Sequence, residues 1–199
     1  DEKKGYEIEG LVWFQGWNDL VNRSVYPEKP NHRFAKYTEW MADFIRDSRK
    51  DLGSPEMKCV IGVIGVGGVS GNQKMLELRD AMTATASLPE FKGNVLAVQT
   101  APFWDDSLAA VDKKRGEVRQ LSRQLKKKSK RHANKDGTMS AEEQRAYVEK
   151  FRAQLITAEE AARFKRGASN AGYHYLGCAK TMALIGKAYA EAMLQMEGR

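Results

Sequence analysis

Three runs of apolar and β-branched residues lie in the first hundred positions, and each ends in a turn rich in glycine or polar residues. The runs cover residues 7–14, 58–65 and 94–100. The second run, KCVIGVIG, is apolar throughout, which is typical of a strand buried on both faces. The pattern therefore predicts three strands.

Elsewhere, apolar residues recur at spacings of three and four, as they do along one face of a helix. This spacing predicts helices from about residue 31 to 50, from the end of the Gly-rich segment 65–72 to Pro89, and over residues 179–196. The expected apolar stripes are Phe34, Tyr37, Met41, Phe44 and Ile45 in the first helix, Met75, Leu78 and Met82 in the second, and Met182, Ile185, Tyr189 and Met193 in the third.

Strands that alternate with helices predict a parallel α/β sheet, whose ligand site lies beyond the carboxyl ends of the strands. The three strands end at residues 15–19, 65–72 and 100–106, so we expect these loops to converge. The first strand would lie at a sheet edge, where unpaired backbone is a liability. We therefore expect further strands N-terminal to Asp1 that this chain does not contain.

A charged segment, residues 112–166, interrupts the alternation. Residues 113–166 include 17 basic and 7 acidic side chains, whereas the net charge of the whole chain is only +7. We expect two charged helices around residues 132–140 that form a solvated hairpin. The predicted organisation is an α/β core (1–111), the inserted hairpin (112–166) and a last segment of the core domain (167–199).

The composition excludes several classes of protein. With 42% apolar and 30% charged residues, the chain is globular rather than disordered. No run approaches the roughly 18 apolar residues that span a membrane, so we expect no membrane partner. Two cysteines are too few for a disulfide scaffold.

The turn after the first strand, WFQGWND at residues 13–19, is the most informative segment about chemistry. Gly16 lets the backbone approach a substrate closely, and the side-chain amide of Asn18 can donate a hydrogen bond to a developing oxyanion. Asn18 and Asp19 can equally cap a short helix. The residues alone leave both interpretations open.

His174 is the best candidate for a catalytic base among the three histidines. It lies in a Gly-containing loop before the last helix, where it can take a proton from a serine and return it to a leaving group. His32 lies at a loop or helix start, and His132 lies in the basic hairpin. A partly buried structural histidine is the alternative interpretation of His174.

Together these segments resemble the SGNH hydrolase superfamily and, within it, the sialate O-acetylesterase branch of the carbohydrate esterases. Residues 16–19 are similar to the Gly-x-Asn-Asp block of the superfamily, and residues 13–16 to the W-x-Q-G of the branch. Residues 78–82 resemble the helix after the middle strand. Residues 174–193 resemble the loop of the catalytic histidine and the final helix.

The resemblance implies a flavodoxin-like three-layer α/β/α fold and the removal of O-acetyl groups from a carbohydrate through an acyl-serine, with no cofactor and no metal. It implies that His174 is the base and that Asn18 and the Gly16 backbone face the oxyanion. It also implies an extracytoplasmic or secreted location. The candidate sugar contacts on strand-end loops are Gln15, Trp17, Phe103, Trp104 and Asp105.

The chain departs from the family in three ways. It holds no block with the nucleophilic serine, and without that serine no acyl-enzyme can form. Ala171 stands where an Asp is usual, which leaves Asn170 or a backbone carbonyl to orient His174; Trp17 stands where the branch often has Glu. Ser70 is a poor substitute, because GVSGN lacks the second glycine of a nucleophile elbow. We therefore expect the C-terminal two thirds of an esterase, inactive alone.

Two other segments suggest ligand sites. The Gly-rich segment 65–71 lies between a strand and a helix, as in dinucleotide-binding proteins, but its spacing is not G-x-G-x-x-G and the next strand ends without an acidic residue. Residues 132–143 fit five positions of a calcium-binding EF-hand loop. His132 stands at the first position, however, where a carboxylate is normally required.

The basic run from Lys126 to Arg131, KKKSKR, can bind an acidic glycan or another polyanion through counterion release. A non-catalytic polyanion- or glycan-binding module is therefore the alternative function. No aromatic residue interleaves with the run, which argues against nucleic acid as the partner. The commonest role of such a run is a solvated face.

Overall fold

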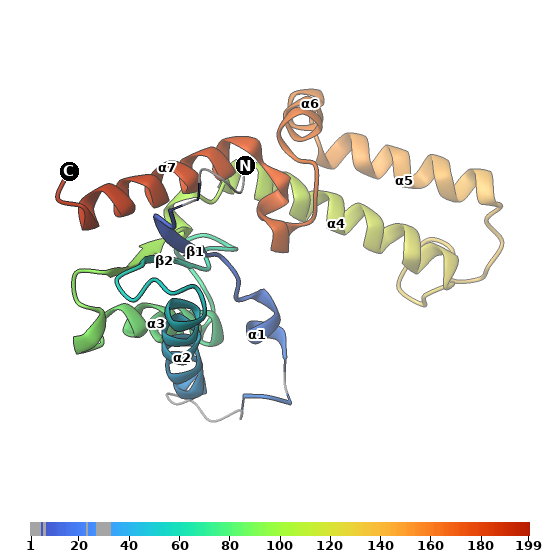
Figure 1. Ribbon diagram of the computed structural model, residues 1–199. Helices are drawn as coiled ribbons and strands as arrows, with labels where there is room; N and C mark the ends of the chain where they lie inside the picture. The colour runs from blue at the N-terminus through green and yellow to red at the C-terminus, as the bar shows by residue number, and fades with distance from the viewer. Residues whose placement is uncertain (1–4, 6, 23, 27–32) are drawn as a thin grey trace. The chain divides into compact units, whose positions relative to one another are not determined.

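The structure is a computed structural model that describes residue 5 and residues 7–22, 24–26 and 33–199. The chain divides into two compact units, each of which is described by itself (Figure 1). The first unit comprises Asp1–Trp104 and Lys180–Arg199, and the second comprises Asp105–Ala179. The second unit thus holds both the charged hairpin and the His174 loop. The domain boundaries expected from the sequence stay a prediction.

The first unit contains a sheet of three parallel strands, β1 (Gly10–Trp13), β2 (Lys58–Val63) and β3 (Val95–Gln99), in the order β1-β2-β3. Val12 is paired with Val60, and Ile61 with Ala97. The parallel α/β sheet predicted from the alternation is confirmed, and β1 lies at its edge. The first strand is shorter than predicted, since it begins at Gly10 rather than at residue 7.

Helices cover both faces of this sheet, which gives three layers (Figure 1). On one face lie α2 (Ala35–Asp51) and α3 (Gln73–Ala86), where the ring of Trp13 contacts that of Phe44 at 4.7 Å between centroids. On the other face lies α7 (Ala179–Met196), whose Tyr189 covers Gly62 so closely that a Cβ there would lie 1.9 Å from the tyrosine hydroxyl. The three-layer α/β/α fold is therefore confirmed.

Most of the predicted helical stripes are buried, with two corrections. Helix α2 begins at Ala35 rather than near Asn31; Asn31 and His32 lie outside the described residues. Met182 is exposed, because the buried face of α7 starts one residue earlier, at Thr181, whose hydroxyl donates to the Phe103 carbonyl (3.0 Å). The remaining short elements of the first unit are α1 (Trp17–Val21), η1 (Pro89–Phe91) and η2 (Ala101–Phe103).

The second unit contains α4 (Asp106–Lys126), α5 (Ala141–Leu155), α6 (Ala158–Gly167) and the irregular turn η3 (Gly172–Gly177). The two helices expected around residues 132–140 are present as α4 and α5, and a third helix, α6, follows them that was not expected. Asp105 caps α4 through Leu108 N (3.0 Å), six residues earlier than expected. Thr157 and Glu160 form a capping box that starts α6 immediately after α5 ends. None of the described helices is long and apolar enough to cross a bilayer.

Candidate functional site

The loops that follow the three strands meet at the carboxyl edge of the sheet. A Cβ on Gly65, two residues after β2, would lie 2.2 Å from the backbone nitrogen of Ala101, which follows β3. Thr100 fixes this contact, because its buried hydroxyl donates to the Val63 carbonyl (2.7 Å). Gly16, after β1, is buried against Ile64. The predicted convergence of the strand-end loops is therefore confirmed.

Arg79 of α3 holds the Gly-rich loop in place. Its side chain is buried, and it donates from Nε to the Ile64 carbonyl (2.7 Å) and from Nη2 to the carbonyls of Val66 (3.2 Å) and Gly68 (2.9 Å). Our sequence analysis missed this role. A signal was present, since Arg79 is four residues after the buried Met75 and therefore shares its helix face.

The Asn18 side chain is not used as a helix cap. Helix α1 begins one residue earlier, its N-cap is Gly16, and no side chain caps it. The Asn18 side chain is exposed and makes no hydrogen bond with any residue that the structure describes. Asp19 does not cap either, because its carboxylate accepts a hydrogen bond from the Tyr26 hydroxyl (2.7 Å). The capping interpretation of this turn is therefore wrong, and the Asn18 amide can still donate.

Aromatic residues surround the turn at Asn18. Tyr37 of α2 donates to the Gln15 carbonyl (3.5 Å), and burial raises the pKa of its hydroxyl to about 12. Burial, reinforced by the Asp19 carboxylate, raises the pKa of Tyr26 well above its ordinary value. Both phenols therefore stay protonated at neutral pH and act as hydrogen-bond donors.

The other expected sugar contacts lie at or near the strand ends. Trp17 opens α1, and Phe103 and Trp104 follow β3; all three are half-buried and leave part of their rings accessible. Asp105 opens the second unit, and its carboxylate accepts from Ser107 Oγ (2.6 Å) and caps α4. These two contacts of the Asp105 carboxylate are typical of a helix cap.

His174 belongs to the second unit and lies in a strained loop. The two residues after it, Tyr175 and Leu176, have φ angles of 53° and 59°, a conformation that bulky side chains rarely adopt. Both side chains are buried, and Leu176 accepts hydrogen bonds from the backbone nitrogens of Ser169 (2.8 Å) and Asn170 (2.9 Å). Such strain persists only where the surroundings fix the backbone, and it is frequent at functional sites.

The His174 imidazole is exposed and packs edge-on against Tyr173, with ring centroids 4.4 Å apart. Its backbone nitrogen donates to the Ala171 carbonyl (3.0 Å). Neither Asn170 nor a backbone carbonyl among the described residues hydrogen bonds to the ring. The Asn170 side chain instead accepts from the nitrogen of Ala171 (2.8 Å). Among the residues described in this unit, the ring contact with Tyr173 is therefore not accompanied by a hydrogen bond to the imidazole.

Residues next to Ser70 and in the EF-hand-like loop, residues 132–143, make contacts that stabilise the local fold. Asn72, which follows the Ser70 segment, caps α3 through Met75 N (3.0 Å). In the EF-hand-like loop, the Asp136 carboxylate accepts from Thr138, and Glu143 accepts from the nitrogen of Ser140 (2.7 Å). Among the described residues, no three His, Cys, Asp or Glu side chains are grouped so that they could hold a metal ion.

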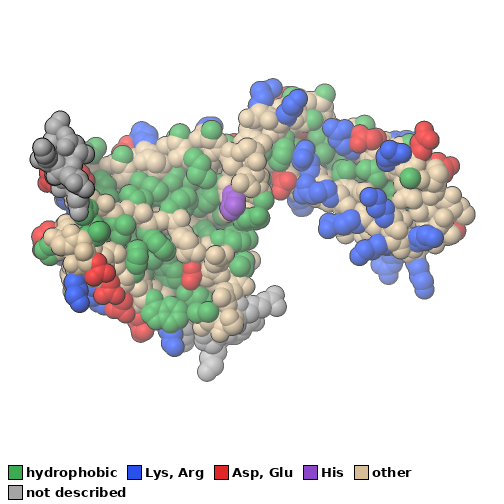
Figure 2. Space-filling model, turned by 45° about the vertical axis from the view of Figure 1, so that its right-hand side comes forward, with side chains coloured by type: hydrophobic (Ala, Val, Ile, Leu, Met, Phe, Trp, Pro, Cys, Tyr) green, Lys and Arg blue, Asp and Glu red, His purple; other side chains and the backbone are tan. Residues whose placement is uncertain are grey.

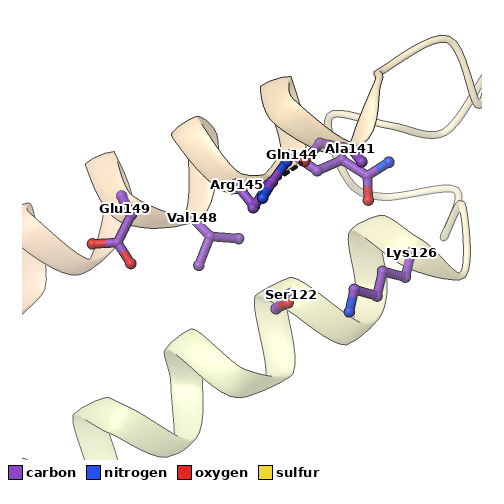
Figure 3. A pocket seen from close by; sticks show the side chains of 7 residues that line it. All are labelled: Ser122, Lys126, Ala141, Gln144, Arg145, Val148 and Glu149. Atoms are coloured by element: carbon purple, nitrogen blue, oxygen red, sulfur yellow. Dashed lines mark hydrogen bonds between the residues drawn. The ribbon is translucent and has the colours of Figure 1, made fainter.

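A groove lies between α4 and α5 in the second unit, with a volume of about 520 Å³ (Figure 3). Lys126 and Arg145 line it from opposite helices, with the apolar side chain of Val148 and the acidic side chain of Glu149. Helix α5 contains no fully buried side chain. Figure 2 shows Lys and Arg side chains gathered over this unit. The groove is therefore lined by both charged and apolar surface.

The comparison with known families identifies the class of protein. A family model described as "Carbohydrate esterase, sialic acid-specific acetylesterase" matches residues 1–108, more than half of the 199 residues. Searches of curated proteins and of solved structures returned no match. The matched segment includes the Asn18 turn and all three strands, whereas His174 lies beyond it. The chain belongs to this family of carbohydrate esterases.

Proposed function

We propose that this protein removes acetyl groups from an O-acetylated sugar, with Asn18 as an oxyanion donor and His174 as the general base. The observation that carries the proposal is the Asn18 side chain. It lies in the family-matched segment, at the edge of the sheet where the strand-end loops meet, and it makes no hydrogen bond with the described residues. A side-chain amide that is not used within the fold can donate to the negative charge that develops on an ester carbonyl oxygen.

The reaction that these roles support has two steps. A serine oxygen attacks the acetyl carbon while His174 takes the serine proton, and His174 then gives that proton to the departing sugar oxygen. Water, activated by the same imidazole, releases acetate from the acyl-serine. The backbone of Gly16 and the amide of Asn18 face the oxyanion in both steps. The exposed imidazole of His174, on a loop with a fixed backbone, supports the role of base.

The residues that would hold the sugar are Gln15, Trp17, Phe103, Trp104 and Asp105. The partly accessible rings at the strand ends support this role, because aromatic faces suit the apolar faces of a sugar. Asp105 is the weakest member of the group, since its carboxylate already caps a helix.

The nucleophile is proposed to come from polypeptide outside these 199 residues. Ser70 is exposed, but no hydrogen bond joins it to a described histidine. We therefore expect the chain alone to hydrolyse an aryl acetate no faster than buffer does. If the chain hydrolyses the ester and His174→Ala abolishes this activity, the proposal of a nucleophile outside these residues is wrong. Hydrolysis that survives His174→Ala but disappears in Ser70→Ala would overturn both assignments.

A second candidate function is the binding of an acidic glycan on the hairpin, and the groove of Figure 3 favours it. Lys126 lines that groove and is also the first residue of the basic run that ends at Arg131. The Lys and Arg side chains of this run are exposed. Counterion release predicts retention on heparin that weakens as salt is added, and a further loss when Lys126, Lys127 and Lys130 are all changed to Gln. Retention that does not depend on salt would exclude this role.

A further inference from the structure

A second pocket of the charged unit lies beside the loop that carries His174. It is formed by α4, the end of α6 and the segment that leads to η3, with a volume of about 420 Å³. Pockets of this size are typical of small-molecule sites. Its lining includes Arg115 and Arg119 of α4, Phe164 of α6, and Ser169 and Asn170 of the segment that follows.

Two guanidinium groups give the pocket its chemistry. Arg115 lies over the ring of Phe164, with 4.4 Å from the guanidinium carbon to the ring centroid, a contact that favours a cation over the ring face. Arg119 is one helical turn further along α4, and its nearest acidic partner is Asp112 at 3.6 Å. One carboxylate therefore faces two guanidinium groups, which leaves an excess positive charge in the pocket.

The opposite wall supplies neutral hydrogen-bonding groups. The Asn170 side-chain oxygen is engaged by the nitrogen of Ala171, but its NH₂ group makes no hydrogen bond with the described residues. The Ser169 hydroxyl donates to the Gly177 carbonyl (2.9 Å) and keeps lone pairs that can accept. Such groups match the hydroxyls of a sugar.

The pocket is held by contacts between the helices that form it. Lys114 of α4 forms an ion pair with Glu160 of α6 (2.5 Å), and this bond lowers the pKa of the Glu160 carboxyl. Leu108 packs against Gly167 so closely that a Cβ on that glycine would lie 3.0 Å from the leucine. The wall that carries Ser169 and Asn170 is fixed by their backbone bonds to Leu176. The pocket is thus formed before any ligand binds.

We propose that this pocket binds the carboxylate of an acidic sugar, with Arg119 and Arg115 as the charged donors and Asn170 as a donor to a ring substituent. The proposal rests on the proposed function, in that it assigns the anionic part of the substrate to the loop that carries the base. Arginine suits this task because its planar fork matches a carboxylate in two parallel hydrogen bonds. Ala171 lines the pocket, and its carbonyl accepts from His174 N, which joins the pocket wall to the loop that carries the proposed base.

The test is a binding measurement on the 199-residue chain, which needs no hydrolysis. A free sialic acid and its methyl ester have nearly the same shape, but only the acid carries the charge. We expect the acid to bind and to shift the Asn170 side-chain amide signal in a ¹⁵N spectrum. The ester should bind at least about tenfold more weakly than the acid. Equal binding of the two sugars would overturn the proposal. Inorganic phosphate that binds as tightly as the acid would also overturn it.

Variants of α4 give the matched control. Arg119→Gln removes one guanidinium without disturbing the Arg115–Phe164 contact, and we expect about tenfold weaker binding of the acid. Arg123→Gln removes the same charge from an exposed residue that does not line the pocket, and we expect no change. Equal losses in the two variants would assign the effect to net charge and overturn the pocket. If the acid binds as expected but no acetylated sugar reaches Asn18, the pocket stands and the proposed function fails.

Discussion

Replacing Arg79 with Met should destabilise the first unit more than any change of an exposed cation. The substitution keeps an unbranched apolar stem but removes the guanidinium that bonds to the carbonyls of Ile64, Val66 and Gly68. Each buried carbonyl left without a donor costs about 1–3 kcal/mol, so the gross loss is about 3–9 kcal/mol. Part of this is offset because the variant no longer buries a charge, a saving of several kcal/mol. We expect a net loss of about 3 kcal/mol, within the range measured for broken buried polar networks.

Tryptophan fluorescence during urea unfolding is the suitable assay. All four tryptophans, Trp13, Trp17, Trp40 and Trp104, lie in the first unit, so the signal does not depend on whether the second unit unfolds separately. Lys92→Met is the control, because Lys92 is an exposed cation of the same unit, and we expect it to leave the midpoint almost unchanged. Equal midpoints for the two variants would refute the claim that Arg79 holds the Gly-rich loop.

Three further predictions concern other contacts. Gly65→Ala should cost about 1–3 kcal/mol of stability in the same assay, because its Cβ would lie 2.2 Å from Ala101 N. Gly186→Ala in α7, which has open space around it, should instead stabilise by about 0.5–1 kcal/mol. An unchanged stability of Gly65→Ala would contradict the close approach of the two loops. Asn134→Ala should lower the stability of the second unit by about 2 kcal/mol, because the buried side chain donates to the Leu125 carbonyl (3.0 Å) and accepts from Met139 N (2.9 Å). An unchanged melting curve in far-UV circular dichroism would argue against that role. Burial raises the pKa of the Cys59 thiol from 9.0 to about 12, so the thiol loses its proton at lower pH in the unfolded chain than in the folded one. The free energy of unfolding should therefore fall as the pH rises from 9 towards 12, and less steeply in Cys59→Val. The same dependence on pH in both proteins would contradict this role of Cys59.

The sheet could be predicted from the sequence because its strands are short, apolar and separated by helical patterns. Every residue of β2 after Lys58 is buried, and Gly65 after that strand allows two of the loops to touch. Helix boundaries were less predictable, since they depend on single capping bonds. Asp105 starts α4 early, and Thr157 starts a helix that apolar spacing alone did not indicate.

The candidate site was only partly readable from the sequence. The spacing of residues around Asn18 pointed to the turn, but it could not separate a helix cap from a free amide, because both use the same side chain. Only the position of the N-cap at Gly16 separates them. The role of Arg79 was missed because its spacing from Met75 indicates a buried helix position but does not indicate its three carbonyl partners on a distant loop.

The proposed roles of Asn18 as oxyanion donor and His174 as general base can be tested together in one titration. An O-acetylated sialic acid is added to the ¹⁵N-labelled chain, and the protein signals and the methyl signal of free acetate are followed together. We expect the signals of the Asn18 side-chain amide and of the His174 ring to shift with the same binding curve, and no acetate to be released. Signals that both stay unmoved would show that the sugar does not bind at Asn18 and His174, and acetate release that disappears in His174→Ala would show that the 199 residues already contain the nucleophile.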